Sequence, residues 1–282
     1  MVEQRPWLTA FSHIMLVLGI AAVALPVWVA LVATTHPNYV FVSGRVPLWF
    51  GDLGFTVFAD VLCQTASRES DVSVASMMLN STIMAFGITL GKLSISILSA
   101  YAVVFFRFPG RMLAFWLVFM TLMLPVEVRI MPTFQVIASL DMLNSFSGLT
   151  IPLIASATAT FLFRQFFMTV PPELLEAARI DGAGPIKFFF DILLPLSRTN
   201  IAALFVITFI YGWNQYLWPL LITTDSNYYT IVMGIKHMLS VPDGEVAWNR
   251  IMATTVLAML PPVVVVVGMQ KFFVKGLVET EK

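Results

Sequence analysis

The stretch Pro171–Asn200, "PPELLEAARIDGAGPIKFFFDILLPLSRTN", separates two hydrophobic segments and is too polar to cross a membrane. Its first half predicts a helix, because the two prolines can open a first turn that acidic residues stabilise, and leucine and alanine supply an apolar side. Gly182 suits the left-handed position that ends such a helix. A second short helix is expected to start at Pro185 and to be broken at Pro195. The stretch therefore predicts a helix-turn-helix between two membrane spans.

The composition predicts an all-α membrane protein. Of 282 residues, 59% are hydrophobic and 11% are charged, about half the charge of an ordinary soluble domain. The formal net charge of zero gives no reason to expect nucleic acid as a partner. The single Cys63 cannot form an internal disulfide, and the three histidines are scattered, so we expect no metal, redox chemistry or cofactor.

Six hydrophobic segments are long enough to cross a bilayer, which takes roughly 20 apolar residues. They are residues 11–33, 74–106, 112–131, 148–168, 201–222 and 251–269. The first exceeds the apolar core of a secretory signal, so we interpret it as a true span. The whole chain, residues 1–282, is thus expected to form one domain of six transmembrane helices, with the polar stretch 171–200 as a loop.

Lys and Arg residues predict the orientation of these spans. With the N-terminus inside, ten of them fall in inner segments and four in outer segments. Both termini and the loop 171–200 are therefore expected on the cytoplasmic side. The outer segment 34–73 is expected to pack as a small external cap, and the aromatic residues of segment 223–250 are expected to anchor at the interface.

Lys92 lies within the second span, in "FGITLGKLSI" (Phe86–Ile95). The two glycines and the lysine resemble a phosphate loop, but only three residues separate Gly87 from Gly91 and Leu93 follows the lysine, which excludes that motif. Lys92 is about 22 Å along the helix from the inner end of the span, too deep for its stem to reach water, so we expect it to face the helix bundle. It could contact a transiting anion, or it could bond to neighbouring helices.

Four further polar or aromatic residues are candidates for lining a translocation path. They are Arg129, Asn80, Trp213 and Asn214. Each has an alternative structural interpretation, since polar side chains commonly bond between membrane helices. Glu127 is two residues from Arg129 and would not share its helix face.

The polar loop carries a family resemblance. The pattern Glu176-Ala177-Ala178, Gly182, Ile192 and Leu194-Pro195 resembles the EAA loop of permease subunits in binding-protein-dependent ABC importers. From about residue 80 to the C-terminus, "MLPVEVRIMPTFQVIASLDMLNSFSGL" and "FLFRQFF" are similar to the maltose-type sugar-importer permeases. Within that family, "SATATFLFRQFFMT" and "LFVITFIYGWNQYLWPLLI" most resemble permeases for sn-glycerol-3-phosphate. Thr199 departs from the pattern, since many relatives place a proline there.

The resemblance implies an ABC importer type I permease in the bacterial inner membrane, with no catalytic residues of its own. It implies three partners: a second homologous permease, an ATPase dimer on the cytoplasmic face and a periplasmic substrate-binding protein. The helix that docks on the ATPase would contain Glu176, Ala177, Ala178, Asp181, Gly182 and Ala183. The implied cargo is sn-glycerol-3-phosphate or its diesters.

Three alternatives differ in cargo or class. A permease of the same kind could import a disaccharide such as maltose or trehalose. A stand-alone secondary transporter could use Lys92, Glu127 and Arg129 for ion coupling. A phosphatidyltransferase is suggested by "ARIDGAG", but only Asp191 follows Asp181 nearby, which is too few carboxylates for that metal-dependent chemistry.

Overall fold

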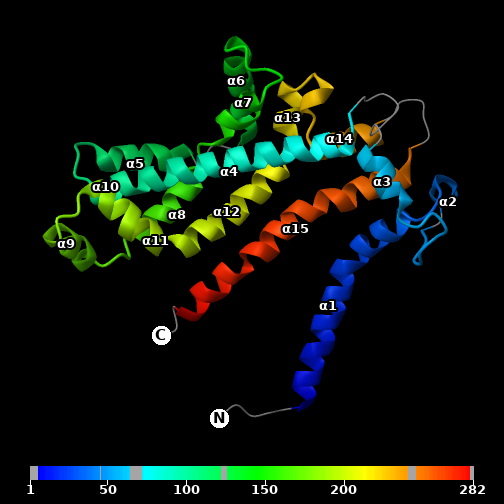
Figure 1. Cartoon of the computed structure of the whole chain (residues 1–282), viewed down its shortest axis with the longest axis horizontal. Helices are drawn as coiled ribbons and strands as arrows, with labels where there is room; N and C mark the ends of the chain where they lie inside the picture. Colours follow the sequence, from blue (N-terminus) through cyan, green and yellow to red (C-terminus); the bar gives the residue numbers. More distant parts are fainter. Residues whose placement is uncertain (1–5, 45, 64–71, 122–125, 241–245, 280–282) are drawn as a thin grey trace. The chain divides into compact units, whose positions relative to one another are not determined.

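The computed structural model describes residues 6–44, 46–63, 72–121, 126–240 and 246–279. Its secondary structure is helical (Figure 1). The chain divides into two compact units, one of Met1–Met77 with Gly234–Leu260 and the other of Met78–Met233 with Pro261–Lys282.

The first unit is built on α1 (Pro6–Ala33). It also holds α2 (Asn38–Val42), α3 (Thr56–Cys63), the second part of α14 (Ile231–Leu239) and the first part of α15 (Trp248–Glu279). The segment after α1 packs as a cap, since the Trp28 indole donates to the Leu48 carbonyl at 3.0 Å and Trp49 offers its carbonyl to His36 at 2.8 Å. The expected cap is thus present in its described part, and residues 64–71 lie outside that part.

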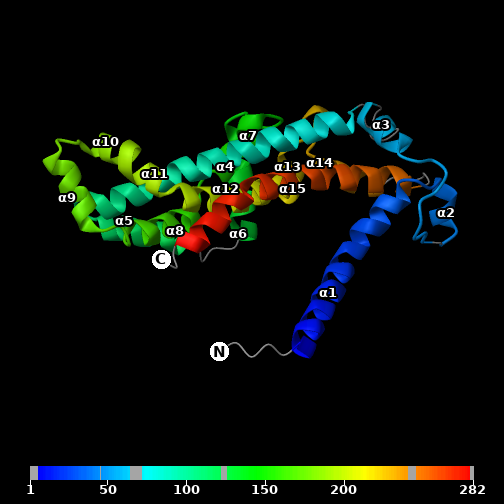
Figure 2. The ribbon, with the colours of Figure 1, turned by 60° about the horizontal axis from the view of Figure 1, so that its bottom comes forward.

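The second unit contains most of α4 (Val74–Phe105) and the helices that follow it. These are α5 (Arg111–Met120), α6 (Val126–Ser139), α7 (Phe146–Thr150), η2 (Ile151–Leu153), α8 (Ala157–Phe167), α9 (Pro172–Ile180), α10 (Pro185–Phe188), the π-helical turn η3 (Phe189–Leu193), α11 (Leu194–Leu196), α12 (Arg198–Trp213), α13 (Leu217–Ile222) and η4 (Ser226–Tyr228). The helices α5, α8 and α12 lie beside α4 in both views (Figure 1, Figure 2).

Three helices are long and apolar enough to cross a membrane. They are Trp7–Ala33, Val74–Phe105 and Trp248–Phe272, and they agree with the predicted spans 11–33, 74–106 and 251–269. Two bent helix pairs raise the number to as many as five in the described part of the chain. The predicted span 112–131 crosses residues 122–125, which lie outside that part, with α5 before them and α6 after.

The predicted span 148–168 is not one straight helix. It consists of Phe146–Leu153 and Ala157–Phe167, which meet at an angle of 47°. The reason is local, because the Ser156 hydroxyl accepts a hydrogen bond from the Ala159 amide at 3.3 Å and so caps a new helix. Hydropathy alone runs through this break, since the residues on both sides are apolar.

The predicted span 201–222 is also interrupted. The helix α12 ends at Trp213, and α13 begins at Leu217. At the end of a helix the last carbonyls lack helical partners, and here the Gln215 amide donates to the Tyr211 carbonyl at 3.0 Å. This bond helps to stabilise the end of α12 at Trp213, nine residues before the predicted end of the span at residue 222.

Two glycines on α4 allow the segment before α8 to pack closely against α4. A Cβ on Gly87 would come within 2.9 Å of Thr150, and one on Gly91 within 2.5 Å of Ile154. Such distances are shorter than packed carbon atoms allow. The glycines of the apparent phosphate loop are therefore packing positions.

Two hydrophobic clusters fill the second unit. One contains Phe163, Phe167, Phe188, Phe189 and Leu193 with residues of α4 that include Leu93. The other contains Met84, Ile88, Leu149, Trp218 and Ile222. Since Ile88 and Leu93 belong to different clusters, the stretch of α4 between them, which holds Lys92, lies where the two clusters meet.

Candidate functional site

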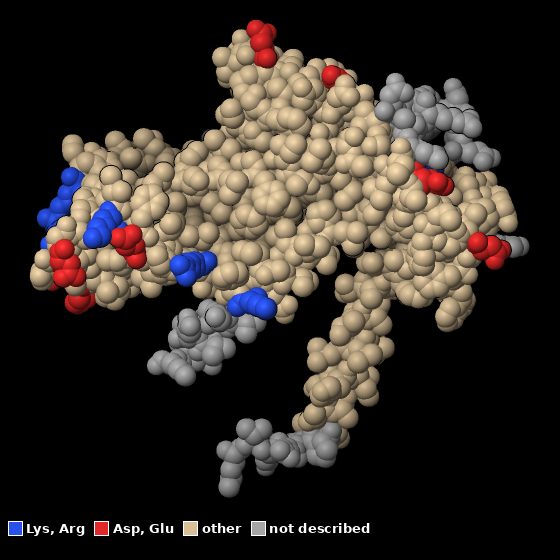
Figure 3. Space-filling model, in the orientation of Figure 1, with Lys and Arg blue, Asp and Glu red and all other residues tan. Residues whose placement is uncertain are grey.

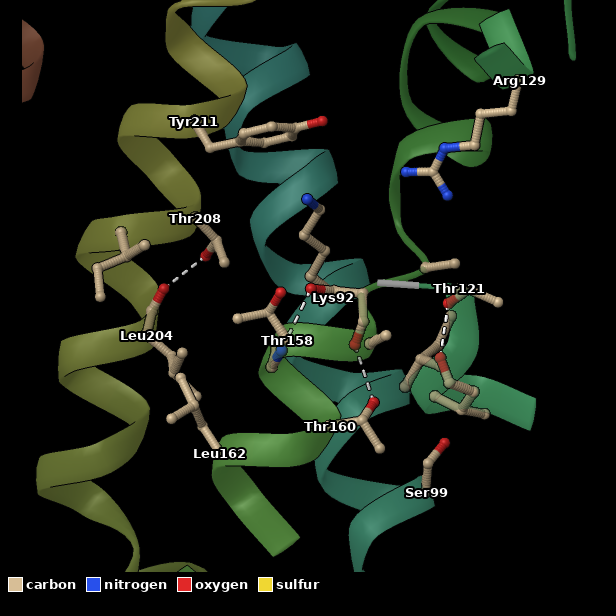
Figure 4. Close-up of a pocket in the computed structure, with 17 residues that line it drawn as sticks. Lys92, Ser99, Thr121, Arg129, Thr158, Thr160, Leu162, Leu204, Thr208 and Tyr211 are labelled. Atoms are coloured by element: carbon tan, nitrogen blue, oxygen red, sulfur yellow. Dashed lines mark hydrogen bonds between the residues drawn. The ribbon is translucent and has the colours of Figure 1, made fainter. Parts of the chain in front are cut away.

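A cavity of about 620 Å³ opens in the second unit between α4, α5, α6, α8 and α12. Its polar lining includes Lys92, Arg129, Ser156, Thr158, Thr208 and Tyr211 (Figure 4). Two of the lining side chains are cations, and none of the described lining residues is a carboxylate. The cavity is therefore suited to an anionic ligand.

Lys92 is buried at the wall of this cavity, with 8% of its surface exposed. Its Nζ lies 3.6 Å from the centroid of the Tyr211 ring, and the described residues offer it no hydrogen bond or ion pair. A desolvated cation over an aromatic ring gains about 2 kcal/mol, whereas burying a charge costs several kcal/mol. The ammonium is therefore only partly compensated by the protein.

Arg129 extends from α6 into the same cavity from the opposite side (Figure 4). It also lines a second cavity of about 390 Å³, together with Asn214 and Gln215. Because Arg129 and Tyr211 line both cavities, the two are adjacent. The Glu127 side chain lies outside the described part, so a role for it stays a prediction.

Two predicted path residues have other surroundings. Asn80 is buried, and its amide donates to the Asn227 carbonyl at 2.7 Å and to the Tyr229 carbonyl at 3.0 Å. Trp213 is buried and stacks on Phe209 with 6.0 Å between ring centroids. Neither residue is among those that line the two cavities described above, and a place for them on the translocation path stays a prediction.

Sequence reasoning missed the residues that α8 and α12 contribute. Tyr211 stands in an apolar run where nothing marks it as facing a cavity. The signal for the α8 residues was Ser156, a residue type that favours the position before a helix. Reading it as a cap would have placed a helix start inside the predicted span.

The helix α9 ends as its sequence predicts. Gly182 adopts φ +74°, the Gly182 amide donates to Arg179 at 3.1 Å, and the Ala183 amide donates to Ala178 at 2.8 Å. These two bonds form a Schellman motif, the usual way in which a glycine stops a helix. The left-handed cap at Gly182 is confirmed.

The faces of α9 differ from the expectation at one residue. Glu176, Ala177 and Asp181 are exposed, but Ala178 is 4% exposed and belongs to the cluster of Phe163 and its neighbours. Ala178 therefore faces its own chain and lets α9 approach its own bundle. Leu175 and Ala183 also pack against this cluster, so the surface that a partner could meet is formed by the exposed residues of the helix.

The segment after α9 also differs from the expectation. The predicted break at Pro195 is wrong, because the helical path continues through it and turns by 73° at Ser197. The π-helical turn that ends at Leu193 places Pro195 at the start of α11, where its missing N–H is tolerated. Phe188 and Phe189 pack in the core, whereas Phe190 is exposed.

Apolar helices of membrane length, one of which carries a buried lysine beside a cavity, indicate an α-helical membrane protein. Residues 92–279 match the family of binding-protein-dependent transport system inner membrane components. The chain belongs to this family.

Named relatives and a solved structure agree with this membership. Over its full length and theirs, the chain is 57% identical to the sn-glycerol-3-phosphate transport system permease protein UgpE of Pectobacterium atrosepticum and to that of Escherichia coli K12. The fold is similar to that of a chain in the crystal structure of a bacterial ABC transporter involved in the import of the acidic polysaccharide alginate. The superposition covers 97% of this chain and 99% of that chain, with a TM-score of 0.82 and 19% sequence identity. The latter likeness concerns the fold.

Proposed function

We propose that this chain is the membrane-spanning permease subunit of an ATP-driven ABC importer that carries sn-glycerol-3-phosphate or its diesters into the cytoplasm. The observation that carries the proposal is the cavity with Lys92 and Arg129 and no described carboxylate. Relatives that are 57% identical over the whole chain bear the name of that transport system. A disaccharide is neutral and would leave both cations without a counter-charge.

Electrostatics favours a phosphate ester in such a cavity. A phosphate monoester carries nearly two negative charges at neutral pH. Two cations in a partly desolvated site attract it more strongly than they would in water, because charges interact more strongly at low dielectric. The cargo thus supplies the counter-charge that Lys92 lacks, and release leaves the ammonium on the Tyr211 ring.

The helix α9 would join the chain to the ATPase. Its exposed Glu176 and Asp181 offer polar contacts, and Ile180 is 86% exposed. Ile180 would add an apolar contact to that joint. The chemistry of ATP hydrolysis would belong to that partner, and this chain would be non-catalytic.

The distribution of charge supports an orientation with α9 in the cytoplasm, and the count of Lys and Arg along the sequence supports the same side for both termini. Lys and Arg residues of the second unit gather toward the end that holds α9, where Arg107, Arg111 and Arg179 surround a cavity of about 870 Å³ (Figure 3). Basic residues are enriched on the cytoplasmic side of membrane proteins. A second homologous permease and a periplasmic binding protein would complete the importer.

Transport would then be a change of conformation. When the ATPase subunits move, α9 would transmit the movement to the helices around the cavity, which would open alternately to each side. Because Ala178 packs in the hydrophobic cluster with residues of α4, α8 and α12, α9 would move together with these helices. No covalent step on the cargo is needed.

Purification of the tagged chain in mild detergent, followed by mass spectrometry, tests the subunit role. We expect an ATPase and a second permease to accompany it, and an untagged strain gives the background. Titration of the accompanying binding protein with sn-glycerol-3-phosphate and with maltose then tests the cargo. A chain that purifies alone and transports in vesicles without ATP would instead be an ion-coupled carrier, and the proposal would be wrong.

A further inference from the structure

The N-terminus of α8 opens on the first cavity. The residues around the break, from Ala155 to Thr160, all line it. The first N–H groups of a helix have no partner within the helix. The Ser156 hydroxyl takes up the amide of Ala159, whereas the amides of Ala157 and Thr158 have no partner in the part of the chain that the structure describes. These two donors are available to a ligand.

The polarity of α8 favours a negative ligand at this place. The N-terminus of a helix carries a partial positive charge, and its free amides point at whatever lies before it. In transporters, broken helices commonly present such ends to anionic substrate groups in the membrane. The helix is 11 residues long, enough to develop this field.

Lys92 is a second and independent sign of an anion at the same place. It is more than nine-tenths buried, lines the same cavity and points into it (Figure 4). One turn further along α4, the Ser96 hydroxyl donates to the Ser156 carbonyl at 3.3 Å. This bond holds the lysine-bearing helix against the break, and Lys92, Ala157 and Thr158 all line the same cavity.

We infer that the amides of Ala157 and Thr158, the Lys92 ammonium and the Arg129 guanidinium form a subsite for the phosphate group of the cargo. The inference rests on the proposed function and adds the atoms that bind. Backbone amides give the subsite a fixed direction, and the two side chains neutralise the charge. Tyr211 holds the ammonium in place when no anion is bound.

Replacing Ala157 with proline tests the subsite with little change elsewhere. Ala157 is the first residue of α8, a position where proline is well tolerated. Ser156 has φ −145° and ψ 104°, the extended conformation that a residue before proline prefers. The variant Ala157→Pro therefore removes one N–H donor and keeps the helix, and Ala157→Gly is the control that keeps the donor.

The measurement is calorimetric titration of the purified importer complex with sn-glycerol-3-phosphate and, separately, with inorganic phosphate. We expect Ala157→Pro to weaken both affinities by roughly tenfold, the usual effect of losing one hydrogen bond to a charged group. Ala157→Gly, which keeps the amide donor, should weaken both affinities clearly less than Ala157→Pro does. Lys92→Met should weaken binding by at least as much, and Lys92→Arg should restore part of it.

Each result has one meaning for the subsite. If Ala157→Pro assembles and binds both anions as tightly as the unmodified complex, the subsite is wrong. If that variant does not assemble, Lys92→Met decides, and unchanged binding by it refutes the inference. An unmodified complex that binds phosphate in this Ala157-dependent way but takes up no sn-glycerol-3-phosphate would keep the subsite and refute the proposed cargo.

Discussion

Replacing Gly182 with valine should uncouple ATP hydrolysis from transport. Gly182 has φ +74°, and a Cβ at that position would meet nothing within 4 Å, so the substitution acts through the backbone alone. A left-handed conformation costs about 1–2 kcal/mol for a residue with a side chain. This free energy corresponds to a roughly fivefold to thirtyfold loss of the conformation in which the Schellman motif orients α9.

The assay compares the ATPase rate with the uptake rate of the reconstituted importer. We expect Gly182→Val to lower uptake per ATP, whereas Gly182→Asn should be milder because asparagine tolerates left-handed backbone. Gly110 is the matched control, since it has φ +78° and an equally open position before α5. Normal coupling in Gly182→Val, or equal loss in Gly110→Val, would refute the role assigned to the turn after α9.

Two further predictions concern the packing around the cavity. Gly91→Val should lower the thermal midpoint of the complex, because the new side chain would overpack against Ile154 at a cost of about 1–3 kcal/mol. The control Gly19→Val should leave the midpoint unchanged, since nothing lies within 4 Å of a Cβ at that position. Equal midpoints for the two variants would contradict this packing. Asn144→Gly should lower the free energy of unfolding by about 2 kcal/mol, because the Asn144 side chain accepts hydrogen bonds from the Thr224 and Asp225 amides at 2.7 and 2.9 Å. Denaturation of that variant at the unmodified midpoint would show that the bonds do not contribute.

The parts of the fold that the sequence predicted are those set by local signals. Long uninterrupted apolar runs predicted the positions of α1, α4 and α15, because the thickness of the bilayer sets the length of a membrane-spanning helix. The end of α9 at Gly182 was predicted because only glycine adopts that backbone conformation cheaply. The breaks at Ser156 and Trp213 were missed, since they depend on a hydrogen bond that Ser156 accepts and one that Gln215 donates, which hydropathy does not register.

The candidate site was predicted only in part for a related reason. Lys92 could be identified because its depth in the span forbids contact with water. Tyr211 and the α8 amides could not, because their place at the cavity follows from how α8 and α12 pack against α4. Asn80 was assigned to the path from its polarity, but its partners are carbonyls 147 and 149 residues away in the chain. Hydrogen-bond partners so distant in the sequence depend on the tertiary structure and cannot be predicted from the residues around Asn80.

The uptake of radiolabelled sn-glycerol-3-phosphate into proteoliposomes tests the central claim most directly. The vesicles would contain the complete importer, with its binding protein added outside and with or without ATP at the ATPase subunits. We predict saturable uptake that requires ATP and that excess maltose does not compete away. Uptake of maltose in place of the phosphate ester, or uptake of the ester that proceeds equally without ATP, would contradict the account.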